Sequence, residues 1–300
     1  MSHPIRSIGF IGIGNMGWPM AARLVGAGFA VAVSDAVPGR AQKFVAEVGG
    51  SDQDIADADA IVTILPTSTQ VAEVIAGLRA SLRPGMVVIE MSSGQPSATQ
   101  AIAADLAGLG IAMVDAPVSG GVARAVTGEL AIMAGGEESA LDRVDPVLRA
   151  MGTTITRVGP VGAGQAMKAL NNLVSAAGYL IGIEALLMGQ RFGLDPALMV
   201  DVLNSSTGMT NSSQKKFRQF VLSRGFDSGF GLDLMVKDLT IAMQLGRETG
   251  TPAPFAALCR EMWAAAATSL GPGQDHTAVA RLSEHLAGTE LASPQVNRRG

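Results

Sequence analysis

The sequence predicts a doubly wound, mainly parallel α/β sheet followed by an all-α half. Apolar runs of strand length alternate with helical stretches through the first half, a glycine-rich turn follows the first strand, and only helical patterns follow Gly159-Pro160. A length of 300 residues suggests about two domains. We therefore expect a sheet domain over residues 1–161, a helical domain over 162–288 and a loose tail over 289–300.

Composition narrows the class of protein. Only 16% of the residues are charged, against about 25% in typical globular domains, and the net charge is -4. This acidic balance argues against a nucleic-acid surface. The single cysteine, Cys259, lies in an alanine-rich apolar segment, so we expect it in the core and expect no disulfide within the chain.

The apolar segments indicate a cytoplasmic protein. The N-terminus enters a strand directly, which leaves no room for a signal peptide. The longest apolar stretch, Ala169 to Ile183, contains two asparagines and is too short to span a bilayer. We therefore expect a soluble protein without a membrane partner.

The first strand, Ser7 to Ile11, leads into a G-x-G-x-x-G turn and a helix, which is the context that a dinucleotide fingerprint requires. The first glycine makes the turn, the second lets the backbone approach the pyrophosphate, and the third lets the helix pack on the strand. Backbone N–H groups at the helix start then bind the phosphates. The expected cofactor-binding turn comprises Gly12, Ile13, Gly14, Asn15, Met16 and Gly17.

An acidic residue, Asp35, ends the next strand, Phe29 to Ser34. A carboxylate at this point accepts hydrogen bonds from the adenosine ribose hydroxyls and repels a 2′-phosphate, so it favours NAD over NADP. The alternative is that Asp35 caps a helix in the segment beginning at Pro38.

The α/β alternation continues beyond Asp35. A helix capped by Ser68 or Thr69, a helix from Ser97 and a helix over Glu137–Ala150 separate further strands. Those strands are Ala60–Leu65, Met86–Glu90, Ile111–Asp115, Glu129–Ala134 and Thr154–Val158. The ends of parallel strands beside the fingerprint are where a cofactor binds in this architecture, so we expect contacts from Leu65, Pro66 and Ser93, although each also suits an ordinary loop.

A glycine-rich loop, Ser119-Gly120-Gly121, follows the strand that ends at Asp115. Its backbone donors could surround a carboxylate, as in a nest-type anion site. The alternative is a glycine-rich turn without a ligand.

One long helix is expected from Gly162 to Gly193. Successive side chains of a helix are about 100° apart around its axis, and at this spacing the polar residues of the segment form one stripe on an otherwise apolar surface. This pattern suggests a helix that is buried all round. The stripe comprises Lys168, Asn171, Asn172, Ser175 and Tyr179. A buried lysine requires a polar partner or a ligand. Asn172, one turn from Lys168, could orient the lysine or share its ligand. The alternative is that the stripe is the solvent-exposed side of the helix.

The remaining pattern is helical. Asp195-Pro196 should begin a helix that ends at Leu203, before the polar loop NSSTGMTNSS. Further helices are expected over Gln214–Ser223, over Phe230–Glu248, around Trp263 and from Asp275. Lys237 could reach the cofactor or substrate or pair with Asp233, and capping is the expected use of His276.

Four segments together resemble the β-hydroxyacid dehydrogenases, the family of 3-hydroxyisobutyrate dehydrogenase and tartronate semialdehyde reductase. They are GIGNMGWPMAARL, DAPVSGG, GAGQAMKALNN and LMVKDL, and the resemblance covers residues 5–288. It implies a Rossmann domain and a helical domain like that of 6-phosphogluconate dehydrogenase, assembled as homodimers or homotetramers, with no metal. By this resemblance Lys168 is the catalytic residue, Asn172 and the loop Ser119, Gly120 and Gly121 bind the substrate, and Lys237 lies near the nicotinamide.

The implied reaction is hydride transfer between a short 3-hydroxy acid and NAD, which gives the semialdehyde. Lys168 would act as general base towards the substrate hydroxyl. Ser93 stands where the family usually has threonine, and Arg124 stands where it often has a small residue. These departures leave the acid open, and Gly120 favours a carboxylate over a sulfonate.

Alternatives within and outside the class remain. A reductase of tartronate semialdehyde or a related aldehyde acid would use the same residues. Imine reductases lack lysine at position 168, and phosphogluconate dehydrogenases have a much larger second domain. The non-enzymatic alternative is a catalytically silent, nucleotide-bound scaffold.

Overall fold

The computed structural model describes residues 4–52 and 55–291. The chain divides into two compact units, Met1–Lys168 and Ala169–Gly300. The division falls within the long helix, whose start we had expected to be the domain boundary.

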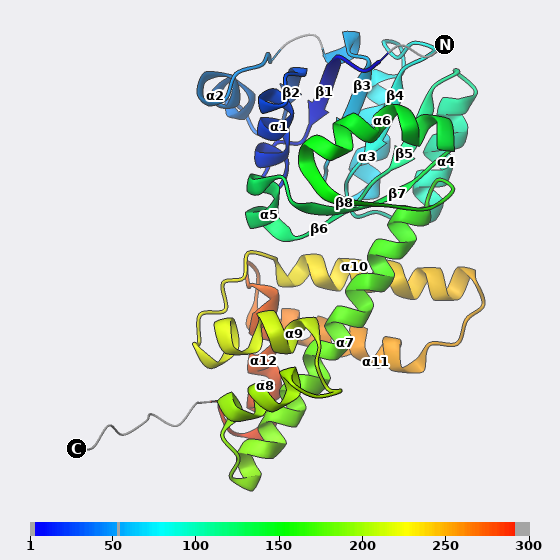
Figure 1. Cartoon of the computed structure of the whole chain (residues 1–300). Helices are drawn as coiled ribbons and strands as arrows, with labels where there is room; N and C mark the ends of the chain where they lie inside the picture. Colours follow the sequence, from blue (N-terminus) through cyan, green and yellow to red (C-terminus); the bar gives the residue numbers. More distant parts are fainter. Residues whose placement is uncertain (1–3, 53–54, 292–300) are drawn as a thin grey trace. The chain divides into compact units, whose positions relative to one another are not determined.

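The first unit is built on a mainly parallel sheet (Figure 1). Its strands are β1 (Ser7–Ile11), β2 (Ala30–Ser34), β3 (Ala60–Thr63), β4 (Val87–Glu90), β5 (Ala112–Asp115), β6 (Val118–Ser119), β7 (Leu130–Gly135) and β8 (Gly152–Gly159). The order is β2-β1-β3-β4-β5-β7-β6, and β8 pairs with β7. Strands β1 to β5 are parallel to one another, whereas β7 runs antiparallel to β5 and β6. The expected α/β class is confirmed.

Helices cover both faces of this sheet (Figure 1). They are α1 (Gly17–Gly26), α2 (Arg40–Glu47), α3 (Ser68–Leu78), α4 (Pro96–Ala107), α5 (Gly121–Thr127) and α6 (Glu138–Met151), with a 3₁₀ turn at Ile55–Asp57. Helices α1 and α6 bury their apolar sides against one face, and α3 and α4 against the other.

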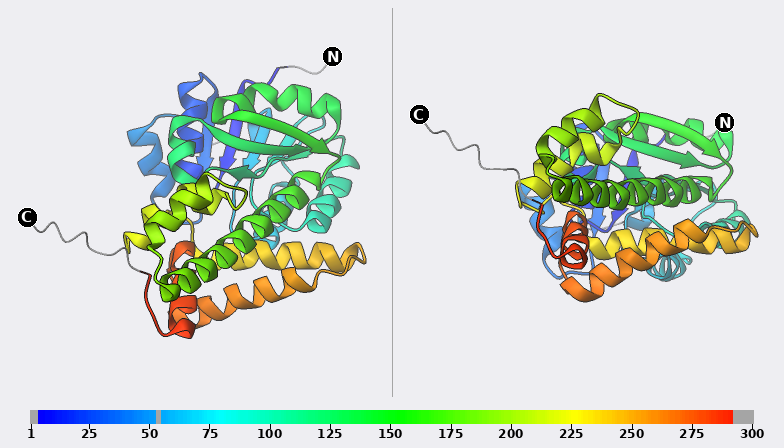
Figure 2. Two further views of the ribbon diagram at one scale, coloured as in Figure 1. Left: turned by 60° about the horizontal axis from the view of Figure 1, so that its bottom comes forward. Right: turned by 90° about the horizontal axis from the view of Figure 1, so that it is seen from below.

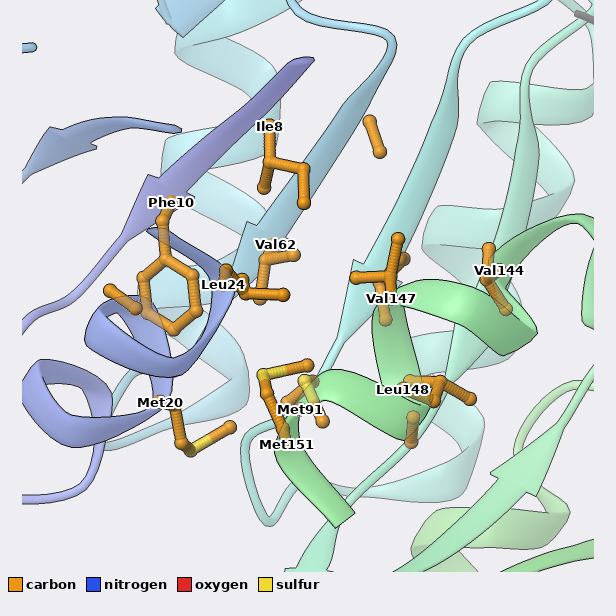
Figure 3. Close-up of a cluster of buried hydrophobic side chains, with 14 of the residues drawn as sticks. Ile8, Phe10, Met20, Leu24, Val62, Met91, Val144, Val147, Leu148 and Met151 are labelled. Carbon is orange, nitrogen blue, oxygen red and sulfur yellow. The ribbon is translucent and has the colours of Figure 1, made fainter. Parts of the chain in front are cut away.

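The larger core of the first unit lies under α1 and α6 (Figure 3). Phe10 from β1, Met20 from α1 and Val147 from α6 are fully buried there. Burial of such side chains contributes roughly 1.5–3 kcal/mol each. The larger core of the first unit therefore lies on the face of the sheet that is covered by α1, the helix that follows the glycine-rich turn.

One local prediction in the first unit was wrong, and one helix was not predicted. The cap of α3 is Thr67, whose side chain accepts the N–H of Gln70, while the Ser68 hydroxyl accepts the N–H of Gln95 instead. The loop after Ser119 continues directly into α5, which we had not predicted.

Helix α7 (Ala163–Phe192) is 30 residues long and lies within the predicted limits. The prediction that it is buried all round was wrong, because one apolar side is exposed: Val174 is 73% exposed and Ile181 is 53% exposed. By length and composition α7 could cross a membrane, a test that core helices of soluble proteins also pass. Tyr179, Ile183 and Leu186 lie in the core of the second unit.

The second unit consists of helices packed around the rest of α7. They are α8 (Pro196–Asn204), α9 (Asn211–Lys215), α10 (Leu232–Glu248), α11 (Pro254–Leu270) and α12 (Ala280–Ala287). Helices α10 and α11 lie side by side, and α7 runs between this pair and α8 with α9 (Figure 2). Trp263 and Tyr179 are fully buried. Their rings pack edge to face, with the ring centroids 6.0 Å apart.

The predictions of where helices begin in this unit agree with the structure only in part. Asp195 caps α8 by accepting the N–H of Ala197. The supposed polar loop instead contains the start of α9, where Thr210 and Ser213 form a capping box. A π-helical turn, Phe217–Leu222, follows α9.

The end of the described chain is anchored. The final helical region begins with a 3₁₀ turn, His276–Val279, before α12. Leu291 is fully buried, and its N–H donates to Glu284. The rest of the expected loose tail, residues 292–300, lies outside the described residues.

Candidate active site

The glycine-rich turn has the backbone that a dinucleotide requires. Gly12 has φ +95°, and a Cβ there would lie 2.3 Å from the carbonyl oxygen of Ile64. A Cβ on Gly17 would lie 1.8 Å from the carbonyl oxygen of Gly12, so only glycine lets α1 pack against β1. A Cβ on Gly14 would meet nothing within 4 Å, so packing does not require glycine there, and the backbone is open to the approach of a pyrophosphate.

Asp35 lies directly after β2 and is tied to that turn. Its carboxylate accepts the N–H of Ile13 at 2.9 Å and the N–H of Val37 at 2.8 Å. It also pairs with the guanidinium of Arg40 at 3.0 Å. Helix α2 starts at Arg40, after Gly39, and receives no side-chain cap, so the alternative role of Asp35 as a cap is excluded.

Leu65, Pro66 and Ser93 lie in the loops that follow β3 and β4, as expected. Parallel pairing of these strands brings the two loops to one edge of the sheet. The hydroxyl of Ser92 accepts the N–H of Leu65 at 2.8 Å, so the loops are joined directly.

The loop Ser119-Gly120-Gly121 joins β6 to α5. Gly120 and Gly121 have φ values of +133° and +69°, a region that favours glycine. A Cβ on Gly120 would lie 2.7 Å from Cδ of Arg124, so the stem of Arg124 covers this loop. The guanidinium of Arg124 is exposed and makes no hydrogen bond or ion pair to the described part of the chain.

Lys168 lies on α7, one turn beyond its first residues, and is 7% exposed. The start of α7 is held by Asp115 at the end of β5. Its carboxylate accepts the N–H groups of Gly162 at 2.7 Å and Gln165 at 2.8 Å. Burial raises the pKa of Asp115 to about 6, although those hydrogen bonds oppose the rise.

Asn172 is buried in the second unit, where its amide donates to Asp238 at 2.5 Å. Asp238 is 2% exposed and lies 3.8 Å from the ammonium of its neighbour Lys237. The second unit thus fixes the orientation of Asn172 through a carboxylate on α10.

Two family models match consecutive parts of the chain. Residues 7–159 match the NAD binding domain of 6-phosphogluconate dehydrogenase. Residues 162–283 match the NAD-binding domain of NADP-dependent 3-hydroxyisobutyrate dehydrogenase. The chain belongs to the β-hydroxyacid dehydrogenase family.

Relatives and solved structures agree with this assignment. The dehydrogenase is 36% identical to 2-(hydroxymethyl)glutarate dehydrogenase of Eubacterium barkeri, over 96% of this chain and 98% of the relative. It is 35% identical to mitochondrial 3-hydroxyisobutyrate dehydrogenase of Mus musculus, over 85% of this chain and 80% of the relative. A structure of Mycobacterium tuberculosis 3-hydroxyisobutyrate dehydrogenase with L-serine superposes with a TM-score of 0.86 at 33% identity, over 93% and 99% of the two chains. The protein is an NAD(P)-dependent hydroxyacid dehydrogenase.

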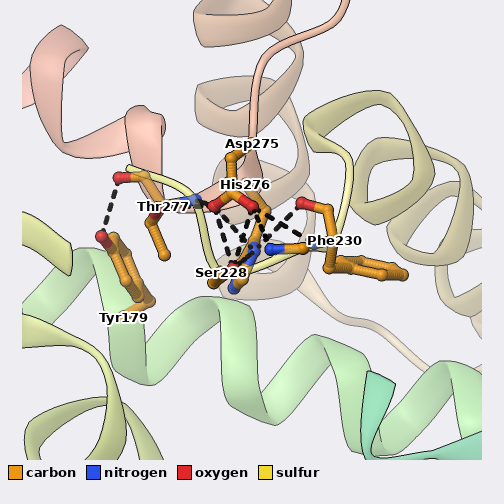
Figure 4. Close-up of polar contacts among 7 residues, drawn as sticks. Tyr179, Ser228, Phe230, Asp275, His276 and Thr277 are labelled. Atoms are coloured by element: carbon orange, nitrogen blue, oxygen red, sulfur yellow. Dashed lines mark hydrogen bonds and ion pairs between the residues drawn. The ribbon is translucent and has the colours of Figure 1, made fainter. Parts of the chain in front are cut away.

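Other polar residues of the dehydrogenase have structural roles. Asp275 caps the 3₁₀ turn and, with Ser228 and His276, ties it to the segment at Phe230 (Figure 4). His276 is buried rather than a cap. Burial raises the pKa of the Cys259 thiol to about 11, which fits a core residue.

Five residues that bind expected site residues, or the loops and the helix that carry them, were not singled out from the sequence. Their common signal is an ionisable or amide group beside an expected site residue or at a strand end. They are Arg40, Glu90, Asp115, Gln165 and Asp238.

Proposed function

We propose that Lys168 is the general base of this dehydrogenase. A nicotinamide cofactor held by the glycine-rich turn Gly12–Gly17 would supply the hydride acceptor for the substrate carbon. As the hydride leaves, the amine of Lys168 takes the proton of the substrate hydroxyl, and it returns that proton in the reverse direction. The observation that carries this proposal is the near-complete burial of Lys168 on a helix whose first turn is hydrogen-bonded to the sheet.

Lys168→Ala tests the assignment. Turnover should fall by about 10²–10⁴-fold, since a positioned acid–base group contributes that much, while NADH binding measured by fluorescence stays unchanged. The matched control is Lys215→Ala, because Lys215 is exposed on α9. Normal turnover in Lys168→Ala would refute the role of Lys168. A wild-type protein that binds NADH but oxidises no hydroxy acid would instead favour the catalytically silent scaffold.

The substrate is a small hydroxy acid whose carboxylate is bound by Ser119, Gly120 and Gly121, with Asn172 as a further substrate ligand. The left-handed backbone at the two glycines supports this assignment, because such turns direct N–H groups towards an anion. We propose a 3-hydroxyisobutyrate-like acid, with a tartronate-semialdehyde-type aldehyde acid as the reductive alternative. NADH production across 3-hydroxyisobutyrate, 3-hydroxypropionate, glycerate and threonate ranks the candidates.

A second candidate substrate carries another carboxylate. Arg124 covers Gly120, and its exposed guanidinium has no partner among the described residues. An arginine in this position suits bidentate binding of a second carboxylate on the same substrate. The relative from Eubacterium barkeri is named for such a diacid.

Arg124→Ala separates the two candidates. If the second carboxylate binds Arg124, KM for 2-(hydroxymethyl)glutarate should rise by about 10-fold or more, since charge-assisted hydrogen bonds contribute about 1.5–3 kcal/mol. KM for 3-hydroxyisobutyrate should stay constant. Equal effects on both acids would remove Arg124 from diacid recognition.

We propose that the cofactor is NAD in preference to NADP. The turn Gly12, Ile13, Gly14, Asn15, Met16 and Gly17 would bind its pyrophosphate; Asp35 would bind its ribose hydroxyls, and Leu65, Pro66, Ser93 and Lys237 would complete the contacts. Arg40 offsets the charge of Asp35, so the discrimination should be moderate. Arg40→Ala should raise the ratio of kcat/KM for NAD over NADP, and Asp35→Ala should lower it; an unchanged ratio in both variants would exclude this pair from cofactor choice.

We propose that the enzyme is cytoplasmic and forms homodimers or homotetramers. The exposed apolar side of α7 in the second unit supports assembly, because a large apolar patch on a soluble protein usually marks an interface. Its members are Leu170, Val174, Ile181, Met188 and Phe192. Val174→Glu should lower the molar mass measured by light scattering, whereas a monomeric wild-type protein would refute assembly.

A further inference from the structure

A buried hydrogen-bond network has Gln165 on α7 at its centre. The side-chain amide of Gln165 donates to Glu90 and to the carbonyl oxygen of Ser92, the latter at 2.9 Å. Its oxygen accepts the N–H of Gly94 at 2.8 Å. Glu90 in turn accepts the N–H of Ser92 at 2.8 Å. Gln165 is 1% exposed and Glu90 is 2% exposed, so water does not compete for these bonds.

The network extends to both sides of Gln165. Through the Ser92 hydroxyl it reaches Leu65 in the loop after β3. Through the N–H of Gln165 it reaches Asp115 at the end of β5, which also binds Gly162. It therefore joins the two proposed cofactor loops to the first turn of α7.

Helix stability alone does not explain this arrangement. A serine or threonine could cap α7 without burying an ionisable group. Here Glu90 and Asp115 are buried side by side as partners in the register of β4 and β5. Burying carboxylates is costly, whereas a buried polar network whose members are hydrogen-bonded makes its surroundings rigid.

We propose that Gln165, Glu90 and Asp115 are positioning residues that hold Lys168 in register with the cofactor loops. The inference rests on the proposed role of Lys168 as general base. Lys168 lies three residues after Gln165, less than one helical turn, so a rotation or shift at Gln165 is transmitted to Lys168 through the rigid backbone. Misplacement of a catalytic group by about 1 Å can cost 10²-fold in rate.

Gln165→Glu tests the network with a change of one amide into a carboxyl. When it is ionised, the introduced carboxyl would repel Glu90, whereas its protonated form can donate to Glu90 as the amide does. Asp115 on β5 is a further ionisable group at this position, because its carboxylate accepts the backbone N–H of Gln165. Lys168 follows three residues later on α7. With 3-hydroxyisobutyrate and NAD as probes, kcat should be about 10-fold to 100-fold below wild type at alkaline pH and should approach wild type as the pH falls. The change in NADH affinity should be smaller than the change in kcat.

A matched control and a reciprocal variant make this test specific. Gln100→Glu makes the same chemical change at an exposed glutamine that donates to Val161 before α7, and it should preserve the wild-type pH profile. The double variant Glu90→Gln/Gln165→Glu restores one amide facing one carboxylate. It should recover most of kcat at alkaline pH, and it replaces the single variant if that fails to fold.

The outcomes separate this inference from the proposed function. If Lys168→Ala is inactive but Gln165→Glu has the wild-type rate and pH profile, the positioning role is refuted and the role of Lys168 stands. If Lys168→Ala is fully active, the proposed base is wrong. In the Lys168→Ala background, Gln165→Glu should lower the residual rate no further. A full additional loss there would show that Gln165 acts by another route and would overturn the inference.

Discussion

Asp115 in the first unit and Asp275 in the second both bind the start of a helical segment, but their pKa values shift in opposite directions. Both carboxylates hold the start of a helical segment by accepting backbone N–H groups. Burial raises the pKa of Asp115 to about 6. At Asp275 burial acts in the same direction, but hydrogen bonds from His276 and Thr277 outweigh it and hold the pKa well below its usual range.

The difference in pKa shows that the ionised form of Asp275 stabilises the fold, whereas the ionised form of Asp115 destabilises it. Asp275 receives donors from Ser228, Gly229, Phe230 and Thr277, so its charge is well compensated. Asp115 is fully buried and depends on fewer donors, so its ionised form destabilises the fold at neutral pH. A costly group retained beside the helix that carries Lys168 fits a functional role better than a structural one.

The largest expected effect is on catalysis. Asp115→Asn replaces one acceptor oxygen by an amide that faces a backbone donor of α7, so kcat should fall by about 10-fold to 100-fold. Asp275→Asn should leave kcat unchanged and lower the melting temperature, since each lost hydrogen bond to a charged group costs about 1.5–3 kcal/mol. Steady-state kinetics and thermal melts of both variants provide the comparison. Equal losses of kcat would mean that the two carboxylates do not differ in function.

The next effect is on the pH dependence of the first unit. The carboxyl of Asp115 loses its proton near pH 3.8 when unfolded but near pH 6 when folded, so between these values the folded state binds more protons. The free energy of unfolding should therefore fall by about 3 kcal/mol as the pH rises through this window. Asp115→Asn should abolish that component.

Each unit contains its own tryptophan, so the units can be followed separately. Trp18 packs against Phe44 in the first unit, and Trp263 is buried in the second. Urea unfolding of Trp263→Phe therefore reports on the first unit through Trp18. A wild-type curve parallel to that of Asp115→Asn between pH 4 and 6 would contradict the raised pKa.

Features that depend on interactions between residues close in the sequence were predicted, whereas those that depend on distant residues were missed. The strand Ser7–Ile11 and the limits of α7 depend on local apolar patterns and flanking glycines, and the structure agrees with both. Lys168 and Asn172 were singled out because helical spacing is local. Their supports were missed, because Asp115 binds Gly162 across 47 positions and Asp238 binds Asn172 across 66. Such pairings depend on sheet order and helix packing, which no local pattern specifies.

The smallest expected effect concerns His276 and sharpens the comparison between the units. Burial lowers the pKa of His276, although its bond to Asp275 opposes this, so the unfolded state binds more protons below pH 6.5. The second unit should therefore lose stability as the pH falls below 6.5, by at most about 1.4 kcal/mol per pH unit, while the first unit gains stability towards pH 4 through Asp115. His276→Gln should flatten the response of Trp263 in Trp18→Phe without altering that of Trp18. If both tryptophans report the same pH slope, the two units unfold together and the opposing contributions of Asp115 and His276 add within one transition.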